Sequence, residues 1–188
     1  MSNAEVSQLD KMLDLKEDFK CLYVEGNFSD VKLCTKTKTF HAHKAILSAR
    51  SSVFLAMLRT DMKEKIQACV DIPDLEDDTV HQMLLYMYTN ALEGLGWERS
   101  LNLYAAADKY EIVSLKSKCS SFLKSNMCPY NVCDVLVLAD MHGDSDLKET
   151  AQNYTIKHEQ EVYTSDKWKV FTKNNYTLAM ETMLLKWN

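Results

Sequence analysis

The chain has 188 residues, of which 46% are hydrophobic and 26% are charged, and its formal net charge is −5. This length is enough for one large domain or two small ones with a buried core, and only four glycines and two prolines argue against a disordered chain. Acidic and basic residues are interspersed without a polybasic run. Nucleic acid and anionic membrane surfaces are therefore not expected partners.

The chain shows no targeting or membrane segment. The first ten residues lack the apolar core of a signal peptide, and no stretch reaches the roughly 18 apolar residues of a membrane helix. We therefore expect a soluble intracellular protein. Its six cysteines contain no CxxC pair, so they are predicted to be free and mostly buried thiols.

An amphipathic helix is predicted for residues 9–24, after a disordered segment at residues 1–8. Leu15, Phe19 and Leu22 recur at steps of four and three, which places them along one side of a helix. The helix is expected to stop at Gly26 and the asparagine after it. Such a stripe can cover the core of its own domain or pair with a second copy of the chain, and the pattern leaves both alternatives open.

Short strands and helices follow. Alternating apolar residues predict a β-hairpin from residues 31–34 and 39–42. Two short helices follow, the second capped by Ser51 or Ser52, and a third strand is expected at residues 66–72. The pattern then changes to a helical period over residues 80–88, and further helices are predicted at about 100–110 and 112–125.

These elements divide the chain into two predicted domains. Residues 9–126 place their strands early and their helices late, which is the pattern of an α+β domain with a small three-stranded sheet. Residues 127–188 are predicted to be all-α, with helices at 132–141, 145–158, 161–171 and 176–186 stacked as hairpins.

Metal binding and catalysis have little support. His41 and His43 share one side of a strand, and Cys34 lies across the predicted hairpin, but a structural metal site usually shows a second closely spaced ligand pair. We expect one imidazole to hydrogen-bond the backbone at the strand-to-helix corner and the other to pack on the following helix. No nucleophile elbow, glycine-rich phosphate loop or HExxH motif occurs. The sequence thus predicts a non-enzymatic protein without metal or cofactor.

One short segment has two interpretations. Residues 62–64 (Met-Lys-Glu) lie between the second short helix and the third strand, where an exposed methionine is costly unless it packs against something. Taken alone, the pattern favours Met62 folded onto its own core and Glu64 in solvent.

Several motifs resemble the signature of the BTB/POZ domain. They are, in order, Phe-Ser-Asp-Val at residues 28–31, Phe-His-Ala-His-Lys-Ala-Ile-Leu-Ser-Ala-Arg-Ser at 40–51 and Tyr-Met-Tyr-Thr at 86–89. Leu-Tyr-Ala-Ala-Ala-Asp-Lys-Tyr at 103–110 and Val-Leu-Ala-Asp at 137–140 resemble the closing helices of that domain and the BACK-type extension beyond it. Over residues 9–186 the chain is similar to the speckle-type POZ protein family. The resemblance implies a BTB domain followed by a BACK-like helical extension.

The resemblance also implies a function. Members of that family are adaptors of cullin-3 ubiquitin ligases, active in the nucleus or cytoplasm, whose BTB domains form dimers. Their cullin-contact motif, a hydrophobic residue, any residue and then Glu, is matched by Met62 and Glu64, which reverses the interpretation of Met62. The implied dimer interface contains Leu15, Phe19, Leu22 and Ile46.

Two departures from that family bear on the expected function. Its members carry a substrate-binding MATH domain before the BTB domain, and only about eight residues precede the first helix here. We therefore expect recruitment of the ligase without target selection, or pairing with a longer relative. The alternative is a BTB scaffold in transcriptional or cytoskeletal complexes without a cullin. At the position of a tyrosine that contributes to a second self-association surface in relatives, this chain has Met183.

Overall fold

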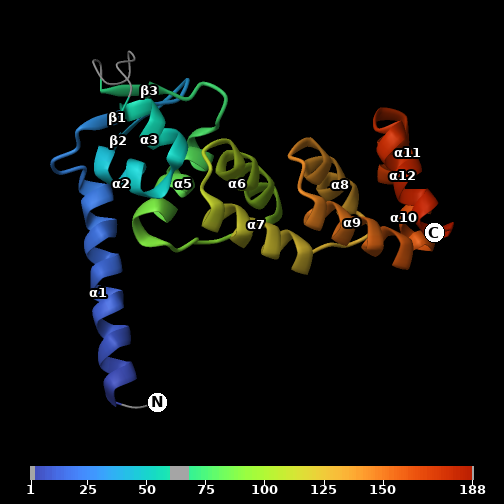
Figure 1. The fold of residues 1–188 in the computed structure, drawn as a ribbon, viewed down its shortest axis with the longest axis horizontal. Helices are drawn as coiled ribbons and strands as arrows, with labels where there is room; N and C mark the ends of the chain where they lie inside the picture. The colour runs from blue at the N-terminus through green and yellow to red at the C-terminus, as the bar shows by residue number, and fades with distance from the viewer. Residues whose placement is uncertain (1–2, 60–67, 188) are drawn as a thin grey trace. The chain divides into compact units, whose positions relative to one another are not determined.

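A computed structural model describes residues 3–59 and 68–187, with side chains from residue 14 onward. Two compact units make up the chain: the first contains Met1–Leu95 and Ala106–Leu115, the second Gly96–Ala105 and Lys116–Asn188. About 70% of the chain is helical, and three short strands near the N-terminus form one sheet (Figure 1). The predicted α+β class with a helical C-terminal part is therefore confirmed.

The sheet contains β1 (Val31–Cys34), β2 (Thr39–Ala42) and β3 (Cys69–Asp71) in the order β2-β1-β3. The predicted hairpin is present, with β1 and β2 antiparallel, whereas β3 pairs in parallel with the other edge of β1. Side chains alternate between the two faces of a strand. The buried face carries Val31, Leu33, Phe40, Ala42 and Val70.

Four helices complete most of the first unit: α1 (Asn3–Glu25), α2 (Lys44–Arg50), α3 (Ser52–Arg59) and α5 (Asp77–Thr89). Because α1 begins at Asn3, residues 3–8 are helical, and the prediction that they are disordered was wrong. Helix α5 lies in the core, with nine residues buried. It ends at Asn90, which adopts the left-handed conformation (φ 55°) that asparagine tolerates well.

The corner between α2 and α3 is fixed by Ser51, which is 2% exposed. Its hydroxyl accepts a hydrogen bond from the backbone N–H of Phe54 at 3.0 Å and donates to the carbonyl oxygen of Tyr110 at 2.5 Å. The Phe54 and Tyr110 rings stack with centroids 4.6 Å apart. Of the two predicted caps, Ser51 is therefore the one that caps α3.

The second unit is helical throughout its described residues. Its elements are α6 (Trp97–Lys109) and α7 (Val113–Ser125), each shared with the first unit, then α8 (Val132–Met141), α9 (Ser145–Lys157), α10 (Glu159–Thr164), α11 (Asp166–Asn174), α12 (Tyr176–Leu184) and a 3₁₀ turn, η1 (Leu185–Trp187). Helices α8 and α9 form a hairpin in which Asp144 caps α9, accepting from the N–H of Leu147 at 3.0 Å.

The single helix predicted at residues 161–171 is two helices, α10 and α11. Ser165 separates them, and its hydroxyl accepts a hydrogen bond from the N–H of Trp168 at 3.1 Å. Serine competes with helix continuation through this capping bond, and a hydrophobic period does not detect the competition.

The cysteines are free, as predicted, but the expectation that most are buried was wrong. Only Cys119 and Cys133 are buried, whereas Cys21 is exposed and the other three are half-buried. Among the helices of the described ranges, none is long and apolar enough to cross a membrane.

Candidate functional site

The C-terminal end of α1 is anchored to α5 by Tyr23, whose side chain is only 7% exposed. Its hydroxyl lies 2.9 Å from Nδ1 of His81, and its ring centroid lies 5.1 Å from that of Tyr88. Burial raises the pKa of Tyr23 and lowers the pKa of His81. Both groups are therefore neutral near pH 7, and the hydroxyl can donate to an uncharged imidazole.

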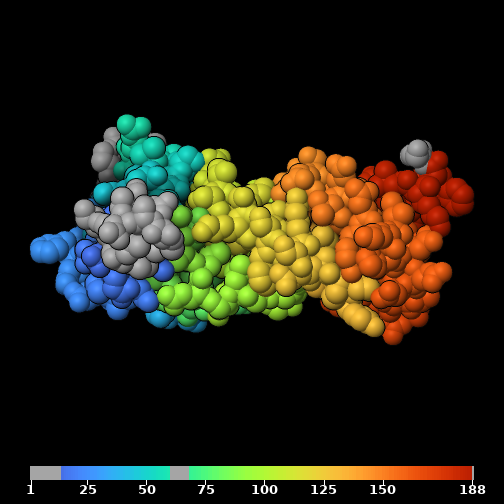
Figure 2. Space-filling view, turned by 90° about the horizontal axis from the view of Figure 1, so that it is seen from below, coloured from blue at the N-terminus to red at the C-terminus, as the bar shows by residue number. Residues whose placement is uncertain are grey.

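The loop after α5 also touches α1. Figure 2 shows the blue residues of α1 beside the light green residues that follow α5. There Lys20 Nζ lies 3.1 Å from a carboxylate oxygen of Glu93. Both side chains are partly or largely exposed, so this ion pair orients the helix more than it stabilises it.

The α1 stripe, made of Leu15, Phe19 and Leu22, continues away from this anchor. Leu15 is 57% exposed, whereas the other two are half-buried. Leu15 precedes Tyr23 by eight residues, about 12 Å along a helix. The pattern allowed α1 either to cover the core of its own domain or to pair with a second copy. The C-terminal end of α1 covers its own unit through Tyr23, whereas the stripe leaves the apolar side chain of Leu15 exposed.

The last turn of α1 and the loop that follows it add exposed apolar side chains that the sequence did not single out as site residues. Val24 is 69% exposed and Phe28 is 95% exposed. Phe28 also has a positive φ of 59°, a strained conformation for a bulky residue. Phe28 belongs to the Phe-Ser-Asp-Val motif, but a loop residue has no periodicity from which its exposure could be predicted.

Ile46, the fourth predicted interface residue, lies on α2 in the same unit. It is half-buried, next to Leu47, which is fully buried in the core. The three residues of the α1 stripe lie on one side of a single helix because of their spacing, whereas Ile46 lies on another helix, α2. Its role in an interface stays a prediction.

At the corner between β2 and α2, both ring nitrogens of His43 are occupied by hydrogen bonds and neither is available to a metal. The backbone N–H of His43 donates to the Tyr88 hydroxyl at 2.9 Å, and Nδ1 of the same ring lies 2.7 Å from it. The hydroxyl therefore donates to Nδ1, which leaves Nε2–H to donate to the carbonyl of Asn27 at 2.8 Å. This confirms the predicted imidazole-to-backbone bond.

His41 behaves differently from its prediction. It is exposed, and its Nδ1 lies 3.4 Å from the Ser29 hydroxyl, in the loop before β1. It also pairs in register with Lys32, whereas Cys34 pairs with Thr39. The two histidines and Cys34 are therefore not assembled into a ligand set.

A family model described as BTB/POZ domain matches residues 19–127, more than half of the chain. The chain belongs to the BTB/POZ family. BTB domains are generally protein–protein interaction modules rather than enzymes. The exposed apolar surface of α1 and its following loop is consistent with such a role, because the matched range starts at Phe19 and includes Phe28.

The residues predicted to contact cullin-3 lie outside the described residues. Met62 and Glu64 belong to the connection between α3 and β3 of the BTB domain. Their assignment rests on the sequence motif and stays a prediction.

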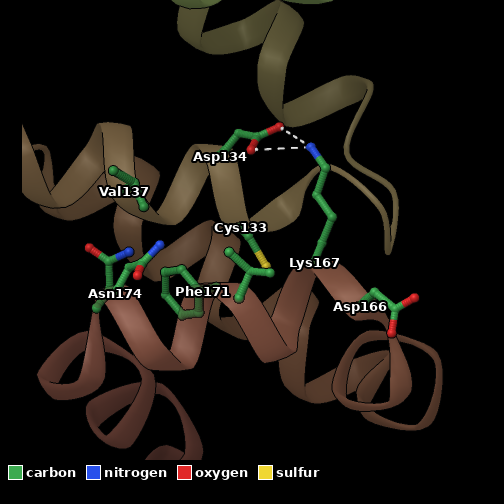
Figure 3. A pocket seen from close by; sticks show the side chains of 9 residues that line it. Cys133, Asp134, Val137, Asp166, Lys167, Phe171 and Asn174 are labelled. Carbon is green, nitrogen blue, oxygen red and sulfur yellow. Dashed lines mark hydrogen bonds and ion pairs between the residues drawn. The ribbon is translucent and has the colours of Figure 1, made fainter.

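Beyond the BTB match, the second unit has a cavity of about 480 Å³ between α8 and α11 (Figure 3). Val137 and Phe171 provide apolar walls, and Lys167 Nζ lies 3.2 Å from an oxygen of Asp134 at the rim. Burial raises the pKa of the Cys133 thiol, the nucleophile in this lining, to about 11. A protonated thiol is a poor nucleophile, so the cavity suits an apolar side chain better than covalent chemistry.

The C-terminal helix of the second unit carries further exposed apolar side chains. Met183, which the resemblance aligns with a tyrosine of a second self-association surface in relatives, is 40% exposed on α12. Leu184, the last residue of α12, is 54% exposed, and Trp187, in the turn η1 that follows, is 80% exposed.

Proposed function

We propose that this BTB protein is a non-enzymatic, dimeric adaptor that docks cullin-3 in a ubiquitin ligase complex. In this role it promotes or modulates the ubiquitination and proteasomal degradation of target proteins. The observation that carries the proposal is the position of the Met-Lys-Glu motif at residues 62–64. In the sequence of this BTB domain it falls between α3 and β3, and the resemblance to the speckle-type POZ family implies that the cullin-contact motif lies in this connection.

In this proposal, Met62 inserts into an apolar pocket of cullin-3, and Glu64 accepts polar contacts from the partner. Methionine suits such a contact because its side chain is unbranched and polarizable. Truncating a buried interface anchor commonly costs about 2 kcal/mol or more, which corresponds to about a thirtyfold change in Kd.

The dimer of the proposal uses the α1 stripe. A symmetric pairing buries the same patch on both chains, so a single exposed apolar patch is sufficient. Leu15 is available for this pairing because its side chain is 57% exposed although it lies on the apolar side of the helix.

A titration of the purified chain with cullin-3 tests the proposal. We expect wild type to bind, and the double variant Met62→Ala with Glu64→Lys to bind at least about thirtyfold more weakly. The matched control is Lys63→Ala, the middle position of the motif, which should bind like wild type. Light scattering should show the same dimer for all three proteins.

Two results would point elsewhere. A wild-type dimer that binds no cullin-3 would favour a BTB scaffold in transcriptional or cytoskeletal complexes. Equal affinities of wild type and the double variant would leave cullin docking possible but would overturn the assignment of Met62 and Glu64.

Co-expression with a longer MATH-BTB relative tests the modulator role, since recovery of only the two homodimers would exclude it.

A further inference from the structure

The solvent-facing side of the sheet gathers two thiols and a carboxylate at the β1–β3 pairing. The parallel register places Lys32 opposite Cys69 and Cys34 opposite Asp71. Because side chains alternate along a strand, all four lie on the face opposite to buried Leu33 and Val70. Cys34 and Cys69 are half-buried and Asp71 is exposed, so solutes can reach the group.

The donor atoms of this group converge closely. The Sγ atoms of Cys34 and Cys69 lie 2.8 Å apart, and Cys69 Sγ lies 4.0 Å from Oδ1 of Asp71. One ligand atom from each of the three residues lies within 4.8 Å of the other two. The hydroxyl of Thr39 lies 3.9 Å from the Sγ of Cys34, on the β2 side.

The distances between these ligand atoms are within about 1 Å of the separations found between the ligands of a bound soft cation. Tetrahedral zinc binds thiolates at about 2.3 Å, which separates two sulfur ligands by about 3.7 Å. Small side-chain rotations that widen the sulfur pair by about 1 Å and bring in the carboxylate would therefore suffice. Water can fill the fourth position, because the site is open to solvent.

The charges also balance. Two thiolates and one carboxylate carry three negative charges, which a divalent cation and the nearby Lys32 ammonium together neutralise. The hydrogen bond with Cys34 and burial raise the pKa of the Cys69 thiol to about 11, and the charge of Lys32 acts in the opposite direction, so a bound cation must displace the thiol proton. Thiolate and carboxylate ligands together favour zinc-like ions over calcium or magnesium, which prefer oxygen ligands alone.

We propose that Cys34, Cys69 and Asp71 form a binding site for a thiophilic divalent cation of the zinc class. Binding releases the two thiol protons to solvent and forms two metal–sulfur bonds and one metal–oxygen bond. The ion links β1 to β3 across a sequence separation of 35 residues between its cysteines. None of its three residues is among those proposed for cullin docking or dimerisation.

Cadmium titration of the 188-residue chain, kept reduced with a non-chelating phosphine, tests the site through the ultraviolet cadmium–thiolate absorption band. We expect one tight equivalent per chain, competed by Zn²⁺. Cys34→Ser and Cys69→Ser should abolish the tight equivalent, and Asp71→Asn should weaken it at least about tenfold, because losing even an outer-shell partner of a metal ligand costs about that much and Asp71 is a direct ligand. Cys21→Ser, which removes an exposed thiol on α1, is the matched control and should bind like wild type.

A second readout is thermal unfolding. At about a hundredfold excess over Kd, Zn²⁺ should raise the unfolding midpoint of wild type and Cys21→Ser by about 5–10 °C. Asp71→Asn changes an exposed side chain and should fold normally, so it remains informative if a cysteine variant does not fold. Tight binding that survives in Asp71→Asn and Cys34→Ser, or no tight equivalent in wild type, would overturn the proposal.

Discussion

The hydroxyl of Tyr23 on α1 and Nδ1 of His81 on α5 lie 2.9 Å apart, and this bond connects the proposed dimerisation helix to the core of the BTB domain. Burial is the main cause that lowers the pKa of His81, and the charge of Lys38 lowers it further. The carboxylates of Asp78 and Glu93 act in the opposite direction. The neutral imidazole is thus the form that the folded protein favours.

Stability should therefore depend on the protonation of His81. Its folded pKa lies below the ordinary value of 6.5, so its contribution is present above pH 6.5 and is lost as the pH falls through the folded pKa. We expect the free energy of unfolding of wild type to fall more steeply from pH 7 to pH 5 than that of His81→Gln. Urea titrations across this range measure the difference.

Carboxylates complicate a single pH curve but not the comparison. Hydrogen bonds from Thr35 and Thr37 lower the pKa of Asp77, so protonation of this carboxylate in acid also lowers the free energy of unfolding. Asp77 is present in both proteins, so its contribution cancels when the two curves are compared. Parallel curves for wild type and His81→Gln would show that His81 does not titrate as described.

Removing the Tyr23 hydroxyl separates the hydrogen bond from ring packing. Tyr23→Phe should lower the free energy of unfolding by about 0.5–1.5 kcal/mol, because the ring still packs but Nδ1 of His81 loses its donor. Tyr23→Ala should cost about 3 kcal/mol or more, because a buried ring is lost. The control is Tyr130→Phe at a 72% exposed position, which should change stability by less than about 0.5 kcal/mol.

Charging the α1 stripe should separate self-association from folding. Leu15→Asp introduces a charge where the side chain is 57% exposed in the single chain, so its unfolding curve should stay within about 0.5 kcal/mol of wild type. In a dimer that buries Leu15 the same charge must be desolvated, so light scattering should show a monomer. Adding Leu22→Asp should strengthen this effect.

Glu17→Lys is the matched control for the stripe, since it changes charge at an exposed position on another side of α1. It should remain a dimer. A dimer of wild-type size for Leu15→Asp would remove this stripe from the interface.

Ser51 should contribute to stability through its two hydrogen bonds. Ser51→Ala removes the cap of α3 and leaves a carbonyl oxygen of the buried Tyr110 without this donor, so unfolding should become easier by about 1–2 kcal/mol. Ser52→Ala is the neighbouring control; its hydroxyl bonds Glu111, but both side chains are exposed, so the loss should be smaller. Equal losses for the two variants would contradict the role of Ser51.

Local elements were predictable because they depend on nearby residues. The hairpin followed from two-residue alternation, and α5 followed from a period of three and four starting in an acidic cluster. The split at Ser165 was missed because one capping bond outweighs continued apolar spacing. The parallel pairing of β3 was missed because strand alternation indicates which face is buried and not which partner is paired.

The sequence by itself determined the α1 stripe, the hairpin, the helical C-terminal part and the Met-Lys-Glu motif, since each depends on residue order over a few turns. Only the tertiary structure decided that Tyr23 is buried while Leu15 on the same helix is exposed, because burial depends on where α5 lies against α1. It likewise brought Cys34 and Cys69 together, through a pairing between strands distant in sequence. Such long-range contacts are set by packing of the whole core, which local periodicity does not encode.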